Sequence, residues 1–378
     1  MRRKFLAVLA VLALGMVFAA ACGRAATPTA APTAAPAADE VTAEVATQAP
    51  TDEPTEAPTE TPTEVPTEIP TEAATEASGP AVDMEDDLGN RIVLETYPQR
   101  IVSLAPSITE SLFAIGAGDR IVGRDTHSDY PPEAQNIPDI GSLWQNLPLE
   151  AILALEPDLV IAAEIISPEQ VKQMQDAGLT VFWLKNPTDF EGLYRNLRVL
   201  ARLTGQEEQA EDLIKSLQTR VAAVEDAVAS IPEDQRPVVF YELSAEDPAA
   251  PWTSGPGTFI DYTITKAGGK NAGAILQDPW AQMSLETLLE VNPDIIILGD
   301  APYGVTPEAV AQRPGWDAIK AVQEGRIYPF NPKLLSVPGP RLIDGLETLA
   351  VLLHPDVFCA AELVQPDPQA VELVCPLP

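Results

Sequence analysis

The stretch WQNLPLEAILALEPDLVI at residues 144–161 has a second copy in the chain, WAQMSLETLLEVNPDIII at residues 280–297. The two copies align over 18 positions without a gap and share the tryptophan, a Leu-Glu pair, a Pro-Asp pair and a final apolar run. Each copy predicts a turn, a short helix that begins near the glutamate, a stop at Pro-Asp and a buried strand. A duplication of this kind indicates that the chain folds into two lobes that are structural repeats.

Short apolar runs alternate with helical patterns on both sides of the two copies. We expect strands at residues 100–104, 119–123, 159–162, 180–184, 238–243, 295–298 and 326–330. We expect helices at residues 108–114, 168–177, 286–291 and 307–322. This alternation is typical of α/β lobes with largely parallel sheets. We place the N lobe at about residues 81–200 and the C lobe at about residues 236–358.

One segment, residues 189–231, lacks any strand pattern. Leucine and valine recur there at helical spacing, which predicts two consecutive helices, the second of about 25 residues. A helix of that length between two α/β halves would form a stiff spine, which we place at about residues 206–231. The expected fold class is therefore α/β, with two Rossmann-like lobes joined by one long helix.

The N-terminus has the pattern of an export signal. Three basic residues, Arg2, Arg3 and Lys4, precede an apolar run at residues 5–21. The sequence AAACG at residues 19–23 resembles a lipobox, so residues 1–22 are expected to form a lipoprotein signal peptide and Cys22 to carry the lipid. The alternative is an ordinary signal peptide followed by an incidental cysteine. Either reading predicts an extracytoplasmic protein, and the first predicts a lipid anchor in a bacterial membrane.

Residues 23–80 are almost entirely alanine, proline, threonine and glutamate, with x-Pro-Thr-Glu repeated from residue 53 to residue 72. Such a composition cannot form a core, and recurrent proline favours an extended chain; residues 27–80 would span at most about 170 Å at about 3.1 Å per residue. We therefore expect a disordered stalk. Threonine and proline together also leave O-glycosylation open.

Two further cysteines, Cys359 and Cys375, lie in the C-terminal tail at residues 359–378. In an exported chain they could form a disulfide, and two free thiols are the alternative. Neither has the CxxC spacing or the adjacent histidine that a metal site or catalysis by these cysteines would require.

The formal net charge is −33, of which residues 1–80 contribute −7 and the remainder −26. This acidity argues against nucleic acid as a partner. It suits solubility at a cell surface and attraction to a basic protein face.

Several motifs resemble those of the solute-binding proteins of ABC importers that have a helical backbone and serve iron siderophores, haem and cobalamin. The resemblance covers residues 99–355 and rests on RIVSLAPSITE (100–110), SDYP (128–131), the two repeat copies, PGW (314–316) and GRIY (325–328). It implies two Rossmann-like lobes on one long helix, a monomer without catalytic residues, and a permease dimer with ATPase subunits as the partner. It also implies that Glu150 and Glu286 contact permease arginines. The alternative for both glutamates is a structural role in a first helical turn, where the helix dipole stabilises a negative charge.

Within that family the likeness is greatest to the cobalamin-binding members. It implies ligand contacts by Tyr130, Trp144 and Trp280, and by looser alignment Trp183 and Trp252, with ordinary packing as the alternative for each. Aromatic walls suit a large ligand with an apolar face, here a cobalt corrinoid or an iron chelate such as haem or a ferric siderophore.

Two positions are expected to be structural: Trp316 belongs to the core and Arg341 begins a helix. The segment at residues 331–341 departs from the family pattern, because it lacks the acidic and basic side chains that cobalamin-binding members have before their Pro-Arg.

Other classes of protein find little support. Capture of a bare metal ion needs several histidines, and the chain has only His127 and His354. An exported enzyme would be expected to show a recognisable motif, yet there is no G-x-S-x-G, no P-loop and no G-x-G-x-x-G after a strand. The glycine-rich TSGPG at residues 253–257 could bind an anion or form a wall of the cleft. We therefore expect no enzymatic activity, no resident cofactor and no metal site.

Overall fold

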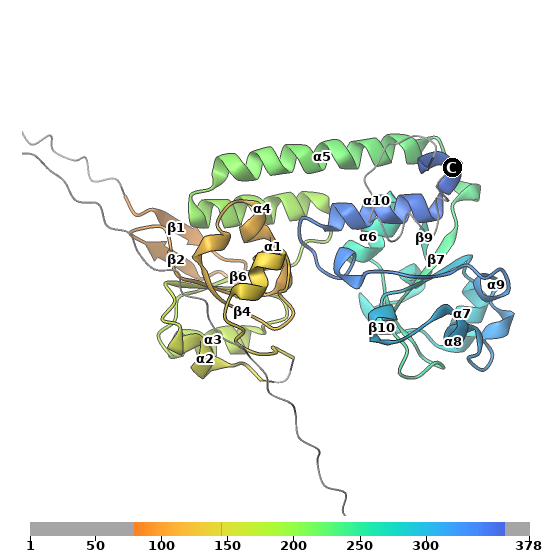
Figure 1. Cartoon of the computed structure of the whole chain (residues 1–378), viewed down its shortest axis with the longest axis horizontal. Coiled ribbons are helices and arrows are strands. Elements are labelled where there is room, and N and C mark those ends of the chain that lie inside the picture. Colours follow the sequence, from red (N-terminus) through yellow and green to blue (C-terminus); the bar gives the residue numbers. More distant parts are fainter. Residues whose placement is uncertain (1–78, 145, 360–378) are drawn as a thin grey trace, which may run out of the picture. The chain divides into compact units, whose positions relative to one another are not determined.

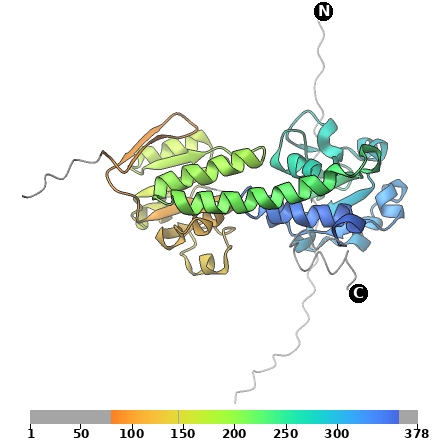
Figure 2. The same cartoon turned by 90° about the horizontal axis from the view of Figure 1, so that it is seen from above.

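The computed structural model describes residues 79–144 and 146–359 (Figures 1 and 2). The signal peptide, Cys22, residues 23–78 of the predicted stalk and Cys375 lie outside these residues. We call the part that contains the sheet of β3 to β6 the N lobe, and the part that contains the sheet of β7 to β12 the C lobe, with the element bounds given below. No helix in residues 79–144 and 146–359 is long and apolar enough to cross a membrane.

The N lobe begins with a hairpin and continues as an α/β unit. Its elements are β1 (Val82–Glu85), β2 (Arg91–Leu94), β3 (Ile101–Leu104), α1 (Pro106–Ala114), β4 (Ile121–Arg124), α2 (Leu149–Ala154), β5 (Leu159–Ala163), α3 (Pro168–Asp176) and β6 (Val181–Leu184). The parallel sheet has the strand order β4-β3-β5-β6. Successive residues of its strands enter two different apolar clusters, one that includes α1 and one that includes α2 and α3. Both faces of the sheet are thus covered, which explains why the strands are almost continuously apolar.

The C lobe is a second α/β unit with an antiparallel edge. Its elements are β7 (Val238–Ser244), β8 (Trp252–Ser254), α6 (Phe259–Lys266), β9 (Lys270–Asn271), β10 (Trp280–Gln282), α7 (Leu285–Val291), β11 (Ile295–Leu298), α8 (Pro307–Ala311), α9 (Lys320–Gln323), β12 (Ile327–Pro329), α10 (Leu342–Leu353) and α11 (Pro355–Phe358). The strand order is β10-β8-β7-β11-β12, and β9 also pairs with β7. β7, β11 and β12 are parallel to one another, β8 is antiparallel to β7, and β10 is antiparallel to β8.

Two helices join the lobes, α4 (Phe190–Thr204) and α5 (Glu207–Ala229). Asp189 caps α4 by accepting a hydrogen bond from the Gly192 N–H, and α4 ends at Gly205, whose φ of 68° is left-handed. The 23 residues of α5 span about 35 Å. α5 reaches from the N lobe to the C lobe in both views (Figures 1 and 2). The prediction of two consecutive helices, the second a long spine, is confirmed.

The apolar face of α5 explains how one helix can hold both lobes. Its buried positions recur every three or four residues: Ala210, Ile214, Leu217, Val221, Val224 and Val228. They belong to a single apolar cluster that also contains core residues of both lobes. At the border of this apolar face, Arg220 of α5 pairs with Asp344 at 2.6 Å and with Glu347 at 2.6 Å, both on α10.

All seven predicted strands are confirmed, as β3, β4, β5, β6, β7, β11 and β12. The single helix predicted at residues 307–322 is wrong, because α8 ends at Ala311 and a 3₁₀ turn, Trp316–Ala318, separates it from α9. The interruption lies at Pro314 and Gly315, where proline removes a backbone donor and glycine takes a φ of 80°. The hairpin β1–β2 and the short strands β8, β9 and β10 were not among the predicted elements.

The sequence duplication is also a structural one. In both lobes a short helix with a glutamate in its first turn, α2 or α7, leads into a buried strand, β5 or β11. Glu156 and Asn292 occupy equivalent positions before Pro-Asp and have φ values of 45° and 48°. Asp158 then accepts the Arg100 N–H at 2.9 Å, and Asp294 accepts the Val238 N–H at 2.7 Å. Pro-Asp therefore ties each repeat to the start of the neighbouring strand.

The turn of the β1–β2 hairpin lies along β6, the edge strand of the N-lobe sheet. Asp86 accepts the Trp183 N–H at 3.2 Å, and Asp87 accepts the Lys185 N–H at 2.9 Å. The Asp87 N–H in turn donates to the Trp183 carbonyl at 3.1 Å, and the Asp87 carboxylate pairs with Arg195. Acidic side chains thus bind backbone groups that an edge strand would otherwise leave unpaired.

Candidate ligand site between two lobes

Two exposed tryptophans lie side by side on the antiparallel edge of the C lobe. β8 pairs with β10 so that Trp280 is opposite Ser254 and Trp252 is opposite Gln282. Because residues two apart on a strand share a face, Trp252 and Trp280 are diagonal neighbours on one face of this ribbon. They are 43% and 45% exposed, while Thr253 between them is buried and donates to the Tyr241 carbonyl.

The neighbouring segments explain why the ribbon takes this shape. The Gly255 N–H donates to the Pro279 carbonyl at 2.7 Å, and a Cβ on Gly255 would lie 2.1 Å from the Asp278 carbonyl oxygen. Only glycine permits this close approach of two backbones. The Trp280 ring packs on Phe259 of α6 with centroids 5.8 Å apart. The ribbon is therefore held rigidly against the lobe, with its two tryptophans on the surface.

The glycine-rich segment does not leave its amides free for an anion. The Gly257 N–H donates to the Asp261 carboxylate at 3.1 Å, and Thr258 caps α6 by accepting the Asp261 N–H at 3.0 Å. A carboxylate of the chain already lies at the start of this helix, so the hydrogen bonds of this segment serve the fold of the lobe next to Trp252.

In the N lobe, Tyr130 lies on a turn that follows β4 and is fixed by buried charges. The Arg124 guanidinium donates to the Ala134 carbonyl at 2.9 Å across the turn. Asp125 accepts the His127 N–H at 3.0 Å and the Ser128 hydroxyl. Burial raises the pKa of the Asp125 carboxyl, and the hydrogen bond from Ser128 acts in the opposite direction. Tyr130 is 41% exposed on this turn.

The C lobe contacts this turn directly, which the sequence did not predict. The Arg341 guanidinium lies over the Tyr130 ring, 3.7 Å from its centroid, and Lys333 pairs with Asp129. Arg341 also pairs with Glu110 of α1. Arg341 comes directly before α10, whose N-terminal end faces the N lobe (Figure 1). Sequence reasoning assigned Arg341 a structural role only; the one signal for a partner was Glu110, a charged residue within the otherwise apolar pattern of a helix.

Trp144, the remaining exposed tryptophan, lies just before α2 and is 72% exposed. Its backbone N–H donates to the Ser142 hydroxyl at 3.4 Å. Within the described part of the chain no ring contact joins it to Tyr130, Trp252 or Trp280. The structure thus brings together Trp252 and Trp280, joins Tyr130 to the C lobe through Arg341, and leaves Trp144 on the surface of the N lobe.

Trp183 lies in the core of the N lobe. It is 8% exposed, its indole N–H donates to the Ile166 carbonyl at 2.9 Å, and its neighbours are the apolar side chains that cover one face of the sheet. We therefore leave Trp183 out of the ligand wall. Trp316 is fully buried and donates to the Pro248 carbonyl, so its predicted place in the core is confirmed.

Glu150 and Glu286 lie at equivalent positions in the first turns of α2 and α7. Both are exposed, and neither has a side-chain hydrogen bond or ion pair within the described residues. Each negative charge is therefore available at the surface of its own lobe.

The two histidines occupy different environments. His127 is exposed on the Tyr130 turn, whereas His354 is buried and hydrogen-bonded to the Gly268 carbonyl at 3.1 Å, and burial lowers its pKa. In residues 79–144 and 146–359 no group of three or more His, Cys, Asp or Glu residues could hold a metal ion. Of the predicted disulfide, Cys359 ends the described chain and Cys375 lies beyond it.

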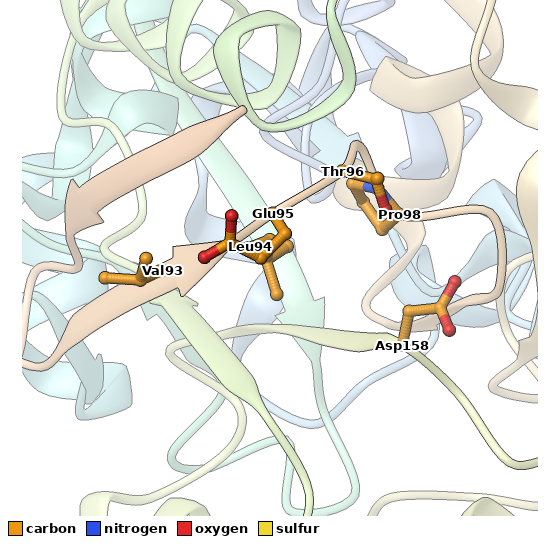
Figure 3. Close-up of a pocket in the computed structure, with 6 residues that line it drawn as sticks. All are labelled: Val93, Leu94, Glu95, Thr96, Pro98 and Asp158. Carbon is orange, nitrogen blue, oxygen red and sulfur yellow. The ribbon is translucent and has the colours of Figure 1, made fainter. Parts of the chain in front are cut away.

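A surface hollow of about 340 Å³ lies elsewhere, between the end of the β1–β2 hairpin and Asp158 (Figure 3). Val93, Leu94, Glu95, Thr96, Pro98 and Asp158 line it. Asp158 precedes β5, so the hollow lies at the amino ends of the parallel strands, and its carboxylate is already bonded to the Gln99 and Arg100 N–H groups. Ligands of α/β sheets bind at the carboxyl ends of the strands, where the Tyr130 turn lies, and we therefore do not assign the ligand to this hollow.

Comparison with known proteins identifies the family. The periplasmic binding protein family matches residues 101–334. The uncharacterized ABC transporter substrate-binding lipoprotein YvrC of Bacillus subtilis (strain 168) is 36% identical over 277 residues, which are 72% of this chain and 86% of that protein. The cobalamin-binding protein of Halobacterium salinarum is 30% identical over 282 residues, 71% of this chain and 73% of that protein.

Among solved structures, the periplasmic haem-binding protein RhuT from Roseiflexus sp. RS-1, in its apo form, matches with a TM-score of 0.62 and 28% identity. The match covers 68% of this chain and 99% of that chain. Together with the match over residues 101–334 and the ABC transporter relative, it agrees with the two-lobed architecture. The chain belongs to the periplasmic binding protein family and is the extracytoplasmic substrate-binding component of an ABC importer, not an enzyme.

Proposed function

We propose that the chain captures cobalamin or a related corrinoid between its two lobes and delivers it to the permease of its importer. The observation that carries this proposal is the pair Trp252 and Trp280, two exposed indoles on one face of a rigid ribbon. Exposed tryptophans next to each other on a well-packed lobe favour a ligand with a broad apolar face. Tyr130 and Trp144 supply the N-lobe side of the wall.

The relatives support a ligand of this class and leave two forms of it. The Halobacterium salinarum relative is a cobalamin-binding protein, whereas the Roseiflexus structure is a haem-binding protein. Both ligands are flat metal macrocycles that aromatic side chains can cover. Haem iron in proteins takes an axial ligand such as histidine, cysteine, methionine or tyrosine. His354 is buried and bonded to the Gly268 carbonyl, which leaves His127 as the histidine of the described chain that could ligate haem iron, beside the Tyr130 hydroxyl. We prefer the corrinoid because the Halobacterium relative is a cobalamin-binding protein, and haem or a ferric siderophore is the second candidate.

Delivery uses one contact from each lobe. We propose that Glu150 and Glu286 pair with arginines on the two subunits of a permease dimer, since both carboxylates are exposed and unpaired within the described chain. Like charges on two equivalent helices suit a partner that is itself two-fold symmetric. ATP hydrolysis by the importer's ATPase subunits then drives release.

The tether places this cycle at a membrane surface. We propose that residues 1–22 are removed, that Cys22 carries the lipid and that residues 23–80 are the stalk of a monomeric binding domain at residues 99–355. The stiff helix α5 limits the closure of the lobes, so the ligand is held mainly by a preformed wall.

Fluorescence titration tests the ligand. The full-length chain in detergent is titrated with cyanocobalamin, haemin and a ferric hydroxamate siderophore, with the exposed Trp144, Trp252 and Trp280 as reporters. The proposal predicts saturable one-to-one quenching by cyanocobalamin, lost in a variant that carries both Trp252→Ala and Trp280→Ala. Saturation by haemin or the siderophore alone would replace the corrinoid with that ligand. No saturation by any of the three would refute the whole ligand class.

A further inference from the structure

We infer that Arg341 is a positioning residue for the ligand wall: held by Glu110 across the boundary between the lobes, it fixes the ring of Tyr130. The inference rests on the proposed function in so far as Tyr130 contacts the ligand. It assigns a role to a contact that joins residues 130 and 341, on opposite lobes of the protein.

The first step is the contact between the guanidinium and the ring. The Cζ atom of Arg341 lies 3.7 Å from the Tyr130 centroid, within the range of a cation–π interaction. The Arg341 side chain is only 13% exposed, and such contacts are stronger where water is excluded. One face of the Tyr130 ring is thereby occupied. A ligand can reach only the opposite face and the edge of the ring.

The second step is what holds Arg341 in place. Its Nη2 pairs with Oε1 of Glu110, which is almost fully buried on α1 of the N lobe. Within the described residues Nε of Arg341 and Oε2 of Glu110 are buried and lack a hydrogen-bond partner. The pair therefore uses one nitrogen instead of the two-pronged geometry that arginine usually prefers with a carboxylate. The planar group remains free to lie on the ring.

The third step is the fit of the segment that carries Arg341. A Cβ on Gly339 would lie 3.1 Å from Oε2 of Glu110 and 3.4 Å from Cα of Ser107, so glycine allows the segment to approach α1 closely. Pro338 shares with N-lobe residues a gap of only about 20 Å³, room for about one water molecule. Lys333, from the same segment, pairs with Asp129 next to Tyr130. The C lobe thus contacts the Tyr130 turn at two adjacent residues.

These contacts give residues 331–341 a function that their sequence concealed. In sequence, the segment only departs from the pattern of cobalamin-binding members, because it lacks the acidic and basic side chains that they have before their Pro-Arg. Two of its basic side chains, Lys333 and Arg341, instead bind the N-lobe turn that presents Tyr130. The orientation of the N-lobe wall therefore depends on side chains of the C lobe.

A readout without ligand tests the positioning itself. The chain has seven tyrosines, so 3-fluorotyrosine labelling of the full chain gives few ¹⁹F signals, and the Tyr130 signal is the one missing in Tyr130→Phe. Arg341→Met is expected to shift and broaden that signal. Arg341→Lys, which keeps the charge but not the planar group, is expected to have a smaller effect. Arg220→Met is the matched control, because Arg220 of α5 likewise pairs with a buried glutamate, Glu347 of α10, and has no contact with Tyr130 within the described residues.

A double-mutant cycle then tests the consequence for binding. In a chain that retains Tyr130, Arg341→Met is expected to weaken cyanocobalamin binding about tenfold. Arg341→Lys is expected to weaken it less. In a Tyr130→Ala background the same change is expected to alter affinity by less than about twofold. Arg220→Met should leave affinity unchanged in both backgrounds, even where it lowers stability.

The outcomes separate this inference from the proposed function. An unmoved Tyr130 signal in Arg341→Met, or equal loss of affinity with and without Tyr130, would overturn the positioning role. If the unaltered chain bound neither cyanocobalamin nor haemin, the proposed ligand would be wrong, and the ¹⁹F signal would still decide whether Arg341 fixes the ring.

Discussion

Arg313 and Glu242 form a doubly hydrogen-bonded ion pair inside the C lobe, with Nη1 2.5 Å from Oε2 and Nη2 2.8 Å from Oε1. Glu242 lies near the carboxyl end of β7 and is completely buried. Asp300, which follows β11, is also buried, and its Oδ1 has no hydrogen-bond partner within the described residues. Burial, together with the negative charge of Glu242, raises the pKa of Asp300 to about 7.

The raised pKa of Asp300 beside Glu242 predicts how the free energy of unfolding depends on pH. Because the pKa of Asp300 is higher in the native state than its ordinary value of 3.8, the native state binds this proton more tightly than the unfolded chain does. The resulting stabilisation is complete below about pH 3.8 and is lost as the pH rises through about 7. The Asp300→Asn variant should not show that loss. At about pH 8.5 its free energy of unfolding should exceed that of the unaltered chain by on the order of 1–3 kcal/mol.

Urea unfolding at about pH 5.5 and about pH 8.5 measures the effect. Asp317→Asn is the control, since Asp317 is an exposed aspartate of the same lobe. Identical pH slopes for Asp300→Asn and the unaltered chain would show that Asp300 titrates normally.

The left-handed residues of the two repeats give a second prediction. A non-glycine residue at positive φ is strained by roughly 1–2 kcal/mol, and asparagine tolerates the conformation better than glutamate. Glu156→Gly should therefore stabilise the protein by roughly 0.5–1 kcal/mol after the entropy cost of glycine, whereas Asn292→Gly should be close to neutral. Thermal unfolding of both variants provides the comparison, and a larger gain at Asn292 than at Glu156 would contradict it.

Trp183 gives a third prediction, which separates packing from ligand contact. Trp183→Phe leaves the Ile166 carbonyl without its donor and opens space in the core, so the free energy of unfolding should fall by about 1–3 kcal/mol. Affinity for cyanocobalamin should stay within about twofold, because the changed side chain is buried in the lobe. A large loss of affinity at unchanged stability would return Trp183 to the ligand wall.

Docking gives the fourth prediction. A chain with both Glu150→Ala and Glu286→Ala should bind ligand normally and fail to support uptake in cells, with each single change having an intermediate effect. The matched control is Glu169→Ala with Glu308→Ala, since these are also exposed glutamates in first helical turns, one in each lobe. Uptake that persists in the first double variant, or that fails equally in the control, would be incompatible with two-point docking.

Much of the fold was readable because its strands are buried on both faces. A continuous apolar run such as residues 295–298 is stable only as a buried strand that is covered on both faces. The sequence duplication indicated the same order of helix, Pro-Asp stop and strand in both lobes. The elements that were missed are short and half exposed. β8 and β10 have only three residues each, directly after Pro251 and Pro279, and their tryptophans are exposed, so neither residue periodicity nor apolar content predicts these strands.

The site was less readable, for two physical reasons. Trp183 belongs to the fully apolar run Val-Phe-Trp-Leu, which by itself indicates burial, and the resemblance outweighed that signal. Glu110 and Arg341 are 231 positions apart in sequence, and nothing local reveals that they meet. Ion pairs between the lobes depend on how the lobes pack. No local pattern in a single sequence indicates which residues that packing brings together.

The acidic turn at Asp86 and Asp87 has a consequence for self-association. Wherever copies of a protein are concentrated, an open strand edge can recruit the edge of a neighbour into a continuous sheet. On β6, carboxylates already accept the N–H groups of Trp183 and Lys185, and Arg195 holds one of these carboxylates in place. A neighbouring strand would have to displace bonded, negatively charged groups before it could add. The hairpin thus opposes the pairing of β6 with a strand of a second copy.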